Sequence, residues 1–297
     1  MVRSFLVVVV LVFALPAEPL LAQVEGAIDL HVHSAPDSTP RALTAIETAQ
    51  IARRHGMRAV LYKSHRFETA TLAYLVSQVV PEVGAYGGIA LNRSVGGFNV
   101  AAIEQMAAMT GSHGRIVWMP TVDAAQGPFA ALVEADEILP ISDGGVLLPE
   151  VVRVLETIAS LDLALATGHS SPQDSLLLVR AARELGIERI VVTHPLDDLD
   201  PAETILEELV ALGAVLEYPF GMVEPIGDLS LDDLVDRIGS IGAESIVLST
   251  DLGQTGNPVP AVGFASGVRQ LLDAGVSQRE IDLMIRLNPA RILNIEP

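Results

Sequence analysis

One pattern repeats along this chain and restricts the folds open to it: a short apolar run ends in polar residues, and a segment with helical spacing follows. Alternation of this kind indicates parallel strands joined by crossover helices. The apolar runs are expected to be strands, at residues 27–33, 58–63, 83–91, 116–121, 163–169, 189–194, 214–218 and 245–251. Helical spacing is clearest at residues 41–54, 70–80, 101–109, 175–185 and 202–212.

Eight units of this kind predict a single (β/α)8 barrel, the TIM-type architecture, over residues 23–297. An open, doubly wound sheet is the competing arrangement, and the regular spacing of the units disfavours it. The spacing has one long exception, residues 123–150, where glycine and proline interrupt the chain after the fourth strand. An insertion that follows a strand end lies on the catalytic face of a barrel, so we expect it to act as a lid.

Residues 1–22 are expected to be a secretory signal peptide, outside the fold. Arg3 precedes an apolar run, 5–15, that is short for a membrane span, and Ala22 ends a stretch of small and apolar residues suited to cleavage. The alternative is an uncleaved anchor. The sequence thus predicts a secreted or periplasmic protein that does not associate with a membrane after cleavage.

Composition narrows the partners and the ligands. Acidic residues outnumber basic ones by 37 to 18, which gives a formal net charge of −19 and argues against binding to nucleic acid or to anionic membranes. The chain has no cysteine, so disulfides and thiolate ligands are excluded, and a transition metal must be held by nitrogen and oxygen. We expect a small-molecule substrate, and homo-oligomer formation stays open.

Polar side chains gather where the predicted strands end. His31 and His33 close the first strand, His169 the fifth, His194 the sixth and Asp251 the eighth. In a barrel these strand ends share one face, on which active sites are built. Two imidazoles on alternate residues of a strand point the same way and can bind one divalent ion. The sequence therefore predicts a metal site on this face.

The remaining strand and histidine positions are less informative. Alternation along the first strand predicts that Leu30 and Val32 share the face opposite to its histidines. His55 and His113 precede strands and are expected to be ordinary surface residues at the other end of the barrel. His65 follows the second strand, and its role stays undecided.

Taken together, the strand-end residues resemble the amidohydrolase superfamily, the metal-dependent barrel hydrolases. The resemblance rests on the His-x-His at positions 31 and 33, the single histidines at 169 and 194, and the aspartate at 251. It extends over nearly the whole chain after residue 22, and the segment from Asn288 to Leu293 is similar to the closing helix of that family.

The resemblance implies a ligand set. It implies that His31, His33 and Asp251 hold one divalent ion, with zinc the expected element. It also implies that His169 and His194 hold a second ion, or that they act on the substrate in members with one ion.

Lys63, the only lysine of the chain, departs from the family pattern. Many two-metal relatives take a carboxylated lysine from the fourth strand, and here the fourth run ends at Thr121 without one. Lys63 closes the second strand, a position from which some relatives supply a bridging ligand. An ammonium beside two cations is repelled, so Lys63 must be neutral, carry a carboxylate or face a single ion. Metal ligand, catalytic group and surface charge all stay open for it, as does one ion against two.

The expected reaction follows from the ion. A divalent metal lowers the pKa of bound water to about 7 and so supplies hydroxide near neutrality. Asp251 can ligate the ion, accept the proton of the water and pass it to the leaving group, while His194 or His169 polarises the carbonyl. We expect hydrolysis of an amide, a lactone or a related ester; decarboxylation and deamination occur in similar folds.

Residues at or just past strand ends are expected to contact the substrate. Arg66 and Arg93 follow the second and third strands and could clamp a carboxylate, although each could equally be a solvated surface arginine. Asn92, Trp118 and Tyr218 are expected to line the pocket.

Two rival functions stay open. A metal-dependent phosphoesterase of the histidinol-phosphatase type would also begin with His-x-His, but it generally adds a closing Asp-x-His, whereas Leu252 and Gly253 follow Asp251 here. The other rival is a secreted binding protein without catalysis. A serine hydrolase is disfavoured because the chain has no Gly-x-Ser-x-Gly motif.

Overall fold

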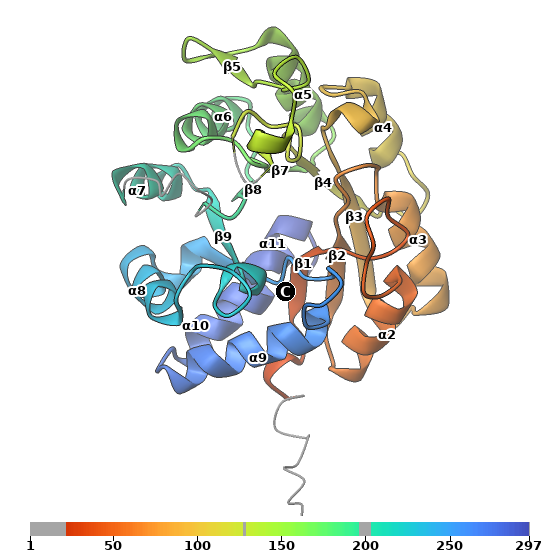
Figure 1. The fold of residues 1–297 in the computed structure, drawn as a ribbon, viewed down its shortest axis with the longest axis vertical. Coiled ribbons are helices and arrows are strands. Elements are labelled where there is room, and N and C mark those ends of the chain that lie inside the picture. The colour runs from red at the N-terminus through yellow and green to blue at the C-terminus, as the bar shows by residue number, and fades with distance from the viewer. Residues whose placement is uncertain (1–21, 127–128, 196–202, 297) are drawn as a thin grey trace, which may run out of the picture.

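The computed structural model describes residues 22–126, 129–195 and 203–296. At its centre, eight parallel strands form a nearly closed barrel that is surrounded by helices (Figure 1). The strands are β1 (Ile28–Val32), β2 (Ala59–Tyr62), β3 (Gly84–Ala90), β4 (Gly114–Trp118), β7 (Ala164–Ala166), β8 (Ile190–Val192), β9 (Val215–Pro219) and β10 (Ile246–Ser249). Each predicted run overlaps one of them, so the predicted (β/α)8 barrel is confirmed.

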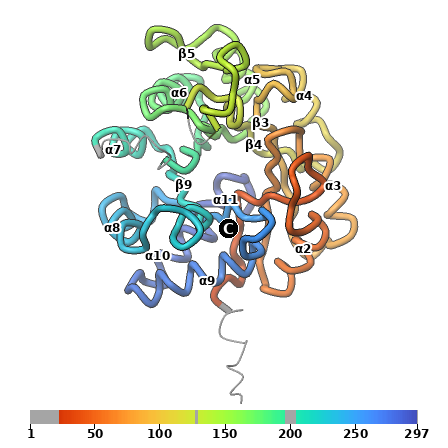
Figure 2. Tube along the Cα trace, in the orientation of Figure 1, coloured from red at the N-terminus to blue at the C-terminus, as the bar shows by residue number. Residues whose placement is uncertain are grey.

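The barrel closes where its first and last strands meet. The chain passes once around the ring in sequence order, so the red N-terminal strand lies beside the blue C-terminal segment (Figure 2). There the amide of Asp251 donates to the carbonyl of His31 at 2.8 Å, and the amide of His33 donates to the carbonyl of Leu252 at 2.9 Å. These bonds fix the end of β1 against the end of β10.

A buried carboxylate reinforces this seam. Asp29 accepts hydrogen bonds from the amide and the hydroxyl of Thr250, at 3.0 and 2.7 Å, and from the amide of His31 at 3.2 Å. Burial raises the pKa of Asp29 to about 7, against the lowering effect of these hydrogen bonds. Asp29 therefore links the two strands that carry the predicted ligands.

Most helices of the outer layer match the predicted segments. The helices around the barrel are α2 (Ala45–Arg54), α3 (Ala70–Val79), α4 (Val100–Ala107), α5 (Pro149–Ser160), α6 (Pro172–Glu184), α7 (Glu203–Ala211), α8 (Leu231–Ile241) and α9 (Pro260–Asp273). The helix expected from residue 41 begins only at Ala45, because Thr44 and Glu47 form a capping box that fixes its start. Residues 41–44 are instead part of the loop after β1.

The apolar side chains form two layers. The outer layer fills the space between the strands and the helices, with Val60, Val117 and Phe264 among its fully buried members. The inner layer fills the barrel, where Leu61 and Trp118 pack together with the C-terminal helix. A barrel of this size is thus a packed core and not a pore.

The C-terminal segment closes the amino end of the barrel. After α10 (Gln278–Asp282) and a π-helical turn (Leu283–Leu287), α11 (Asn288–Leu293) packs against the inner layer. The side-chain amide of Asn288 donates to the carbonyls of Ala243 and Ile246, which lie at the start of β10.

The long insertion after β4 has structure of its own. It contains a 3₁₀ turn (Ala130–Leu132) and an antiparallel pair, β5 (Ser142–Asp143) with β6 (Val146–Leu147), before α5 begins. The amide of Leu139 donates to the carbonyl of Asp123, which ties the insertion to the end of β4. The insertion thus lies at the carboxyl end of the barrel, as expected.

Residues 1–21 of the expected signal peptide lie outside the described residues. In the described ranges, no helix combines the length and the apolar character that a membrane crossing requires.

Two glycine substitutions test the packing of this barrel. A Cβ on Gly88, in β3, would lie 2.2 Å from the carbonyl oxygen of Ile116, whereas a Cβ on Gly239, in α8, meets nothing within 4 Å. Gly88→Ala is expected to lower the free energy of unfolding by about 1–3 kcal/mol through overpacking. Gly239→Ala is expected to raise it by about 0.5–1 kcal/mol, since alanine is the better helix former. Thermal unfolding of both variants measures the effect, and a stable Gly88→Ala protein would contradict the packing described.

Candidate metal centre

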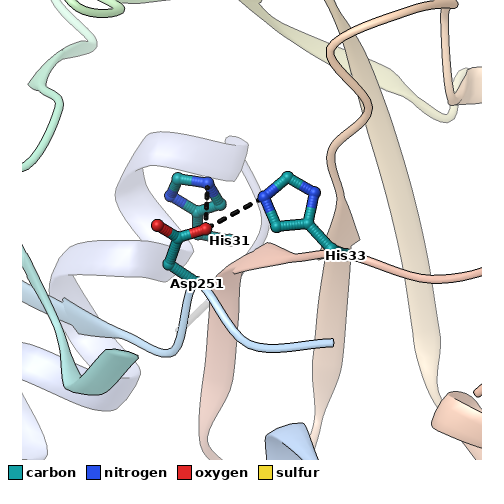
Figure 3. Close-up of side chains that lie close together, drawn as sticks. All are labelled: His31, His33 and Asp251. Atoms are coloured by element: carbon teal, nitrogen blue, oxygen red, sulfur yellow. Dashed lines mark ion pairs between the residues drawn. The ribbon is translucent and has the colours of Figure 1, made fainter. Parts of the chain in front are cut away.

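Three side chains meet at the seam between β1 and β10 (Figure 3). His31 lies on β1, His33 follows that strand, and Asp251 follows β10. Asp251 Oδ1 lies 3.1 Å from His31 Nε2 and 2.9 Å from His33 Nε2, and the three ligand atoms lie within 4.8 Å of one another. In the part of the chain that the structure describes, this is the one such group of three, and it is the candidate metal centre.

A β-bulge directs the end of β1. The register of β1 against β2 shifts between Asp29 and Val32. Leu30 consequently packs inside the barrel and Val32 in the outer layer, so the expectation that these two share a face is wrong. Bulges commonly re-aim side chains beside active sites, and here the histidines on either side of Val32 converge on one carboxylate oxygen.

The second nitrogen of each imidazole fixes its orientation. His31 Nδ1 lies 3.1 Å from Glu217 Oε1, and His33 Nδ1 lies 3.0 Å from the backbone carbonyl oxygen of Lys63. Because a carboxylate and a carbonyl only accept, both Nδ1 atoms carry the proton in neutral rings, and both Nε2 lone pairs face Asp251 Oδ1. Three acceptors aimed at one another repel unless a proton or a cation lies among them. This donor set fits a divalent metal such as zinc.

The charges around the group favour a proton or a cation among these three acceptors. Burial lowers the pKa of His31, but the charges of Asp251 and Glu217 outweigh burial and raise it to about 9. Burial lowers the pKa of His33 to about 4. Burial would raise the pKa of Asp251, but the charge and hydrogen bond of His31 hold it well below its usual range. Asp251 is therefore a carboxylate at neutral pH.

Unusual backbone conformations help to place the strand-end residues. Asp251 has a φ of 50° and His194 a φ of 22°, both in the left-handed region that residues other than glycine seldom adopt. Such strained residues concentrate at functional sites, where the surrounding structure holds them in place.

Lys63 lies directly beside the group. Its Nζ is 2.9 Å from His31 Nε2 and 5.6 Å from the centre of the Trp118 ring, and the residue is 2% exposed. An ammonium at this place repels a cation held by the histidines. Binding of a metal here therefore requires Lys63 to lose its charge, to carry a carboxylate or to move.

The other strand-end histidines lie next to the group without joining it. The ring centres of His169 and His194 are 4.9 Å apart, and the His194 ring centre is 5.9 Å from that of His31. His169 Nδ1 is buried and has no hydrogen-bond partner among the described residues. Burial, followed by the charge of His194, lowers the pKa of His169 well below its usual value, so this ring is neutral.

A cavity of about 500 Å³ opens above the candidate metal centre. His33, Lys63, His169, His194 and Asp251 line its floor, together with His65, which sequence reasoning left undecided. Side chains of the insertion, among them Phe129, Leu132, Val133 and Glu137, line its wall. The insertion thus covers the site, in the place that a lid would take.

Of the residues expected to contact the substrate, Arg66 lines this cavity and four others lie outside its lining. Asn92 is fully buried, and its side-chain amide donates to the hydroxyl oxygen of Thr121 and to the backbone carbonyl of His65. Arg93 is exposed and forms an ion pair with Glu137 of the insertion.

The two aromatic residues are also placed differently from the expectation. Trp118 packs in the inner layer beneath the histidines, with its ring centre 6.5 Å from that of His31. Tyr218 packs in the outer layer, because its side chain leaves β9 on the face that meets the helices.

Sequence reasoning missed two charged residues of the site. Glu217 precedes Tyr218 on β9 and therefore points the opposite way, into the barrel; a buried carboxylate within an otherwise apolar strand was the available signal. Arg41 was assigned to a helix, but it lies in the loop after β1 and lines the cavity. The Thr44/Glu47 capping pattern indicates that the helix begins after Arg41, but nothing in the local sequence indicates that Arg41 lines the cavity.

His55 and His113 are partly buried near the amino end of the barrel. His55 Nδ1 lies 3.0 Å from the carbonyl of Ile51 at the end of α2, and His113 Nδ1 lies 2.6 Å from the carbonyl of Ala85. Both have local structural roles away from the candidate metal centre.

Comparison with known sequences identifies a family match. A model described as a family of unknown function (DUF6282) matches residues 26–217, which include both histidines of the candidate metal centre and Glu217 and end before Asp251. No curated protein sequence matches the chain.

Solved structures share the fold over almost its whole length. An amidohydrolase from Pseudomonas aeruginosa is 11% identical with a TM-score of 0.59, over 94% of this chain and 98% of that chain. The probable dipeptidase PvdM from Pseudomonas aeruginosa is 13% identical with a TM-score of 0.66, over 93% and 96%. An organophosphorus hydrolase from Deinococcus radiodurans is 18% identical with a TM-score of 0.57, over 92% and 93%. The resemblance to the amidohydrolase superfamily is thus confirmed at the level of the fold.

Replacement of the carboxylate behind His31 tests the geometry of the centre. Glu217→Gln is expected to weaken zinc binding by about 10- to 100-fold, because the partner that orients the ring and raises its basicity loses its charge. Competition with a chromogenic chelator measures the affinity, and Glu184→Gln, an exposed position on α6, is the matched control. Equal affinities of the two variants would show that Glu217 does not support the metal ligand.

Proposed function

The chain belongs to DUF6282, a family of unknown function, and we propose that it hydrolyses an amide, lactone or related carbonyl bond at a divalent metal ion. One observation carries the proposal: two imidazole Nε2 atoms with fixed tautomers and one carboxylate oxygen converge at the floor of a cavity. A cluster of this kind, with room for a substrate above it, is the arrangement that metal-assisted hydrolysis needs.

The structural neighbours support this reaction class. Two of them are described as an amidohydrolase and a probable dipeptidase, and both names refer to cleavage of amide bonds. A third is described as an organophosphorus hydrolase, so hydrolysis at phosphorus is also known on this fold. The carbonyl reaction is preferred over that of a histidinol-phosphatase-type phosphoesterase. Such enzymes generally end in Asp-x-His, whereas Leu252 and Gly253 follow Asp251 here.

Different residues of the site have different roles in the proposed hydrolysis. A bound zinc ion would supply Lewis acidity, which activates water and polarises a carbonyl. Asp251 remains ionised and is partly open to the cavity, with a side chain 21% exposed, so it can take a proton from the attacking water and deliver it to the leaving group. His169 and His194, beside it at the cavity floor, orient the substrate carbonyl.

We further propose that the centre holds one ion. The close group contains three ligands, and His169 and His194 lie outside it. In this arrangement Lys63 is a neutral amine beside the ligands and not a bridge between two ions.

Secretion remains part of the proposal, and it rests on the character of residues 1–22 alone. N-terminal sequencing of protein recovered outside the cytoplasm is expected to begin at residue 23. Recovery of the uncut chain would contradict it.

Metal removal and loss of Asp251 test the activity. Turnover of p-nitroacetanilide or δ-valerolactone is expected to disappear after chelation and to return with zinc, because the ion activates the water. Asp251→Asn is expected to lower kcat by about 10²- to 10⁴-fold through loss of the proton-transfer group. Asp232→Asn, at an exposed position on α8, is the control.

The same assay separates the rivals. Hydrolysis of p-nitrophenyl phosphate without any turnover of the amide or the lactone would favour the phosphoesterase. Ligand binding retained by Asp251→Asn, in a protein that never shows turnover, would favour a binding protein.

Metal counting tests the single ion. Elemental analysis of zinc-loaded, desalted protein is expected to give one ion per chain, and Lys63→Met is expected to retain it because the ligands are His31, His33 and Asp251. Two zinc ions per chain in the parent, with fewer ions per chain in Lys63→Met, would instead indicate that Lys63 is a bridging ligand.

A further inference from the structure

A buried arginine forms part of the cavity wall. Arg41 lies in the loop between β1 and α2, and its Nε and Nη2 donate to Asp37 Oδ2 at 3.0 and 2.9 Å. The side chains of the pair are 6% and 2% exposed, and both residues line the cavity. The amide of Thr39 donates to the other carboxylate oxygen of Asp37 at 3.2 Å, which fixes the carboxylate that holds Arg41.

The pairing with Asp37 leaves part of the guanidinium group unused. Within the described ranges, Arg41 Nη1 has no hydrogen-bond partner. This nitrogen is also not sealed from solvent, so it is open to the cavity. A guanidinium that is largely buried needs acceptors for its remaining N–H groups. In this position the acceptor has to come from the contents of the cavity.

The loop that carries Arg41 is attached to the loop that carries Asp251. The amide of Ala42 donates to the carbonyl of Gly253 at 2.9 Å, and Arg41 forms an antiparallel bridge with Gln254. Arg41 also lines the same cavity as His33 and Asp251, two of the candidate metal ligands. A ligand that contacts Arg41 can therefore also reach the metal centre.

The charges around the cavity favour a single negative charge on the ligand. Asp37 neutralises Arg41, and Arg66 adds an exposed positive side chain to the lining. The carboxylates farther along the wall have partners of their own: Glu137 pairs with Arg93, and Asp123 accepts from the Arg93 amide. Because Asp37 compensates Arg41 and the charge of Asp123 has no ion-pair partner among the described residues, the lining offers too little positive charge for a doubly charged phosphate, whereas the free Nη1 edge of the planar Arg41 guanidinium suits a carboxylate.

We propose that Arg41, held by Asp37 and assisted by Arg66, binds a carboxylate of the substrate, so that the substrate is an amide or lactone that carries a carboxylate apart from the bond that is cleaved. This assignment rests on the proposed function and specifies its substrate class. It replaces the pair expected from sequence, Arg66 with Arg93, because Arg93 points to the insertion instead.

Metal-chelating probes test the assignment without a known substrate. The probes are the monohydroxamates of malonic, succinic and glutaric acid, each compared with the analogue whose free carboxylate is replaced by a carboxamide. Binding to the zinc-loaded full chain is measured by calorimetry. The hydroxamate reports on the metal centre, and the difference within each pair reports on the anion subsite.

In the parent protein, the carboxylate probe of at least one length is expected to bind about tenfold or more tightly than its carboxamide analogue, as a charge-assisted hydrogen bond provides. Arg41→Gln is expected to abolish that preference and to leave the carboxamide affinity unchanged within about twofold, since a charge-assisted bond is lost and the metal centre is kept. Arg53→Gln, an exposed arginine at the end of α2, retains the full preference.

A second variant keeps the test valid if Arg41→Gln does not fold. Arg66 is exposed, so Arg66→Gln folds even where loss of the buried Arg41 does not, and it is expected to reduce the carboxylate preference several-fold. Equal binding of carboxylate and carboxamide probes at all three lengths, or an unchanged preference in both arginine variants, overturns the subsite while the metal-dependent hydrolase stands. Failure of the zinc-loaded protein to bind any hydroxamate overturns the proposed function itself.

Discussion

The carboxylate of Asp251 lies between two imidazoles, and the closure of the barrel is what puts it there. Hydrogen bonds between the ends of β1 and β10 bring residues 31, 33 and 251 together, and buried Asp29 ties both strands at this point. The site therefore depends on the seam of the barrel. A sheet that stayed open would separate the histidines from the aspartate, and neither the candidate metal centre nor the floor of the cavity would form.

The groups behind the ligands matter as much as the ligands. Glu217 and the carbonyl of Lys63 set the tautomer of each histidine, so that both Nε2 lone pairs face the same point. The left-handed backbone of Asp251 directs its side chain to that point as well. These features cost stability, since they bury charge and store strain, and a cation at the point where they converge would offset that cost.

The sequence was sufficient for the architecture and for the expectation that His31, His33 and Asp251 lie close together. Eight alternating units predicted the barrel, and the rule that strand ends share one face brought together residues as distant as His31 and Asp251. It was insufficient where tertiary contacts decide. The β-bulge in β1 broke strict alternation. The position of Tyr218 at a strand end did not show that its side chain packs against the helices, whereas Glu217 reaches His31. The capping box at Thr44 shows that Arg41 precedes the helix, but its place in the cavity wall depends on contacts between loops that the sequence does not reveal.

The central claim is that His31, His33 and Asp251 hold a divalent ion. A crystal structure of the zinc-loaded protein, with anomalous data collected above and below the zinc absorption edge, tests it most directly. The account predicts one anomalous peak about 2.0–2.2 Å from His31 Nε2, His33 Nε2 and an oxygen of Asp251. A peak held by other residues, or no peak in fully loaded protein, would contradict it.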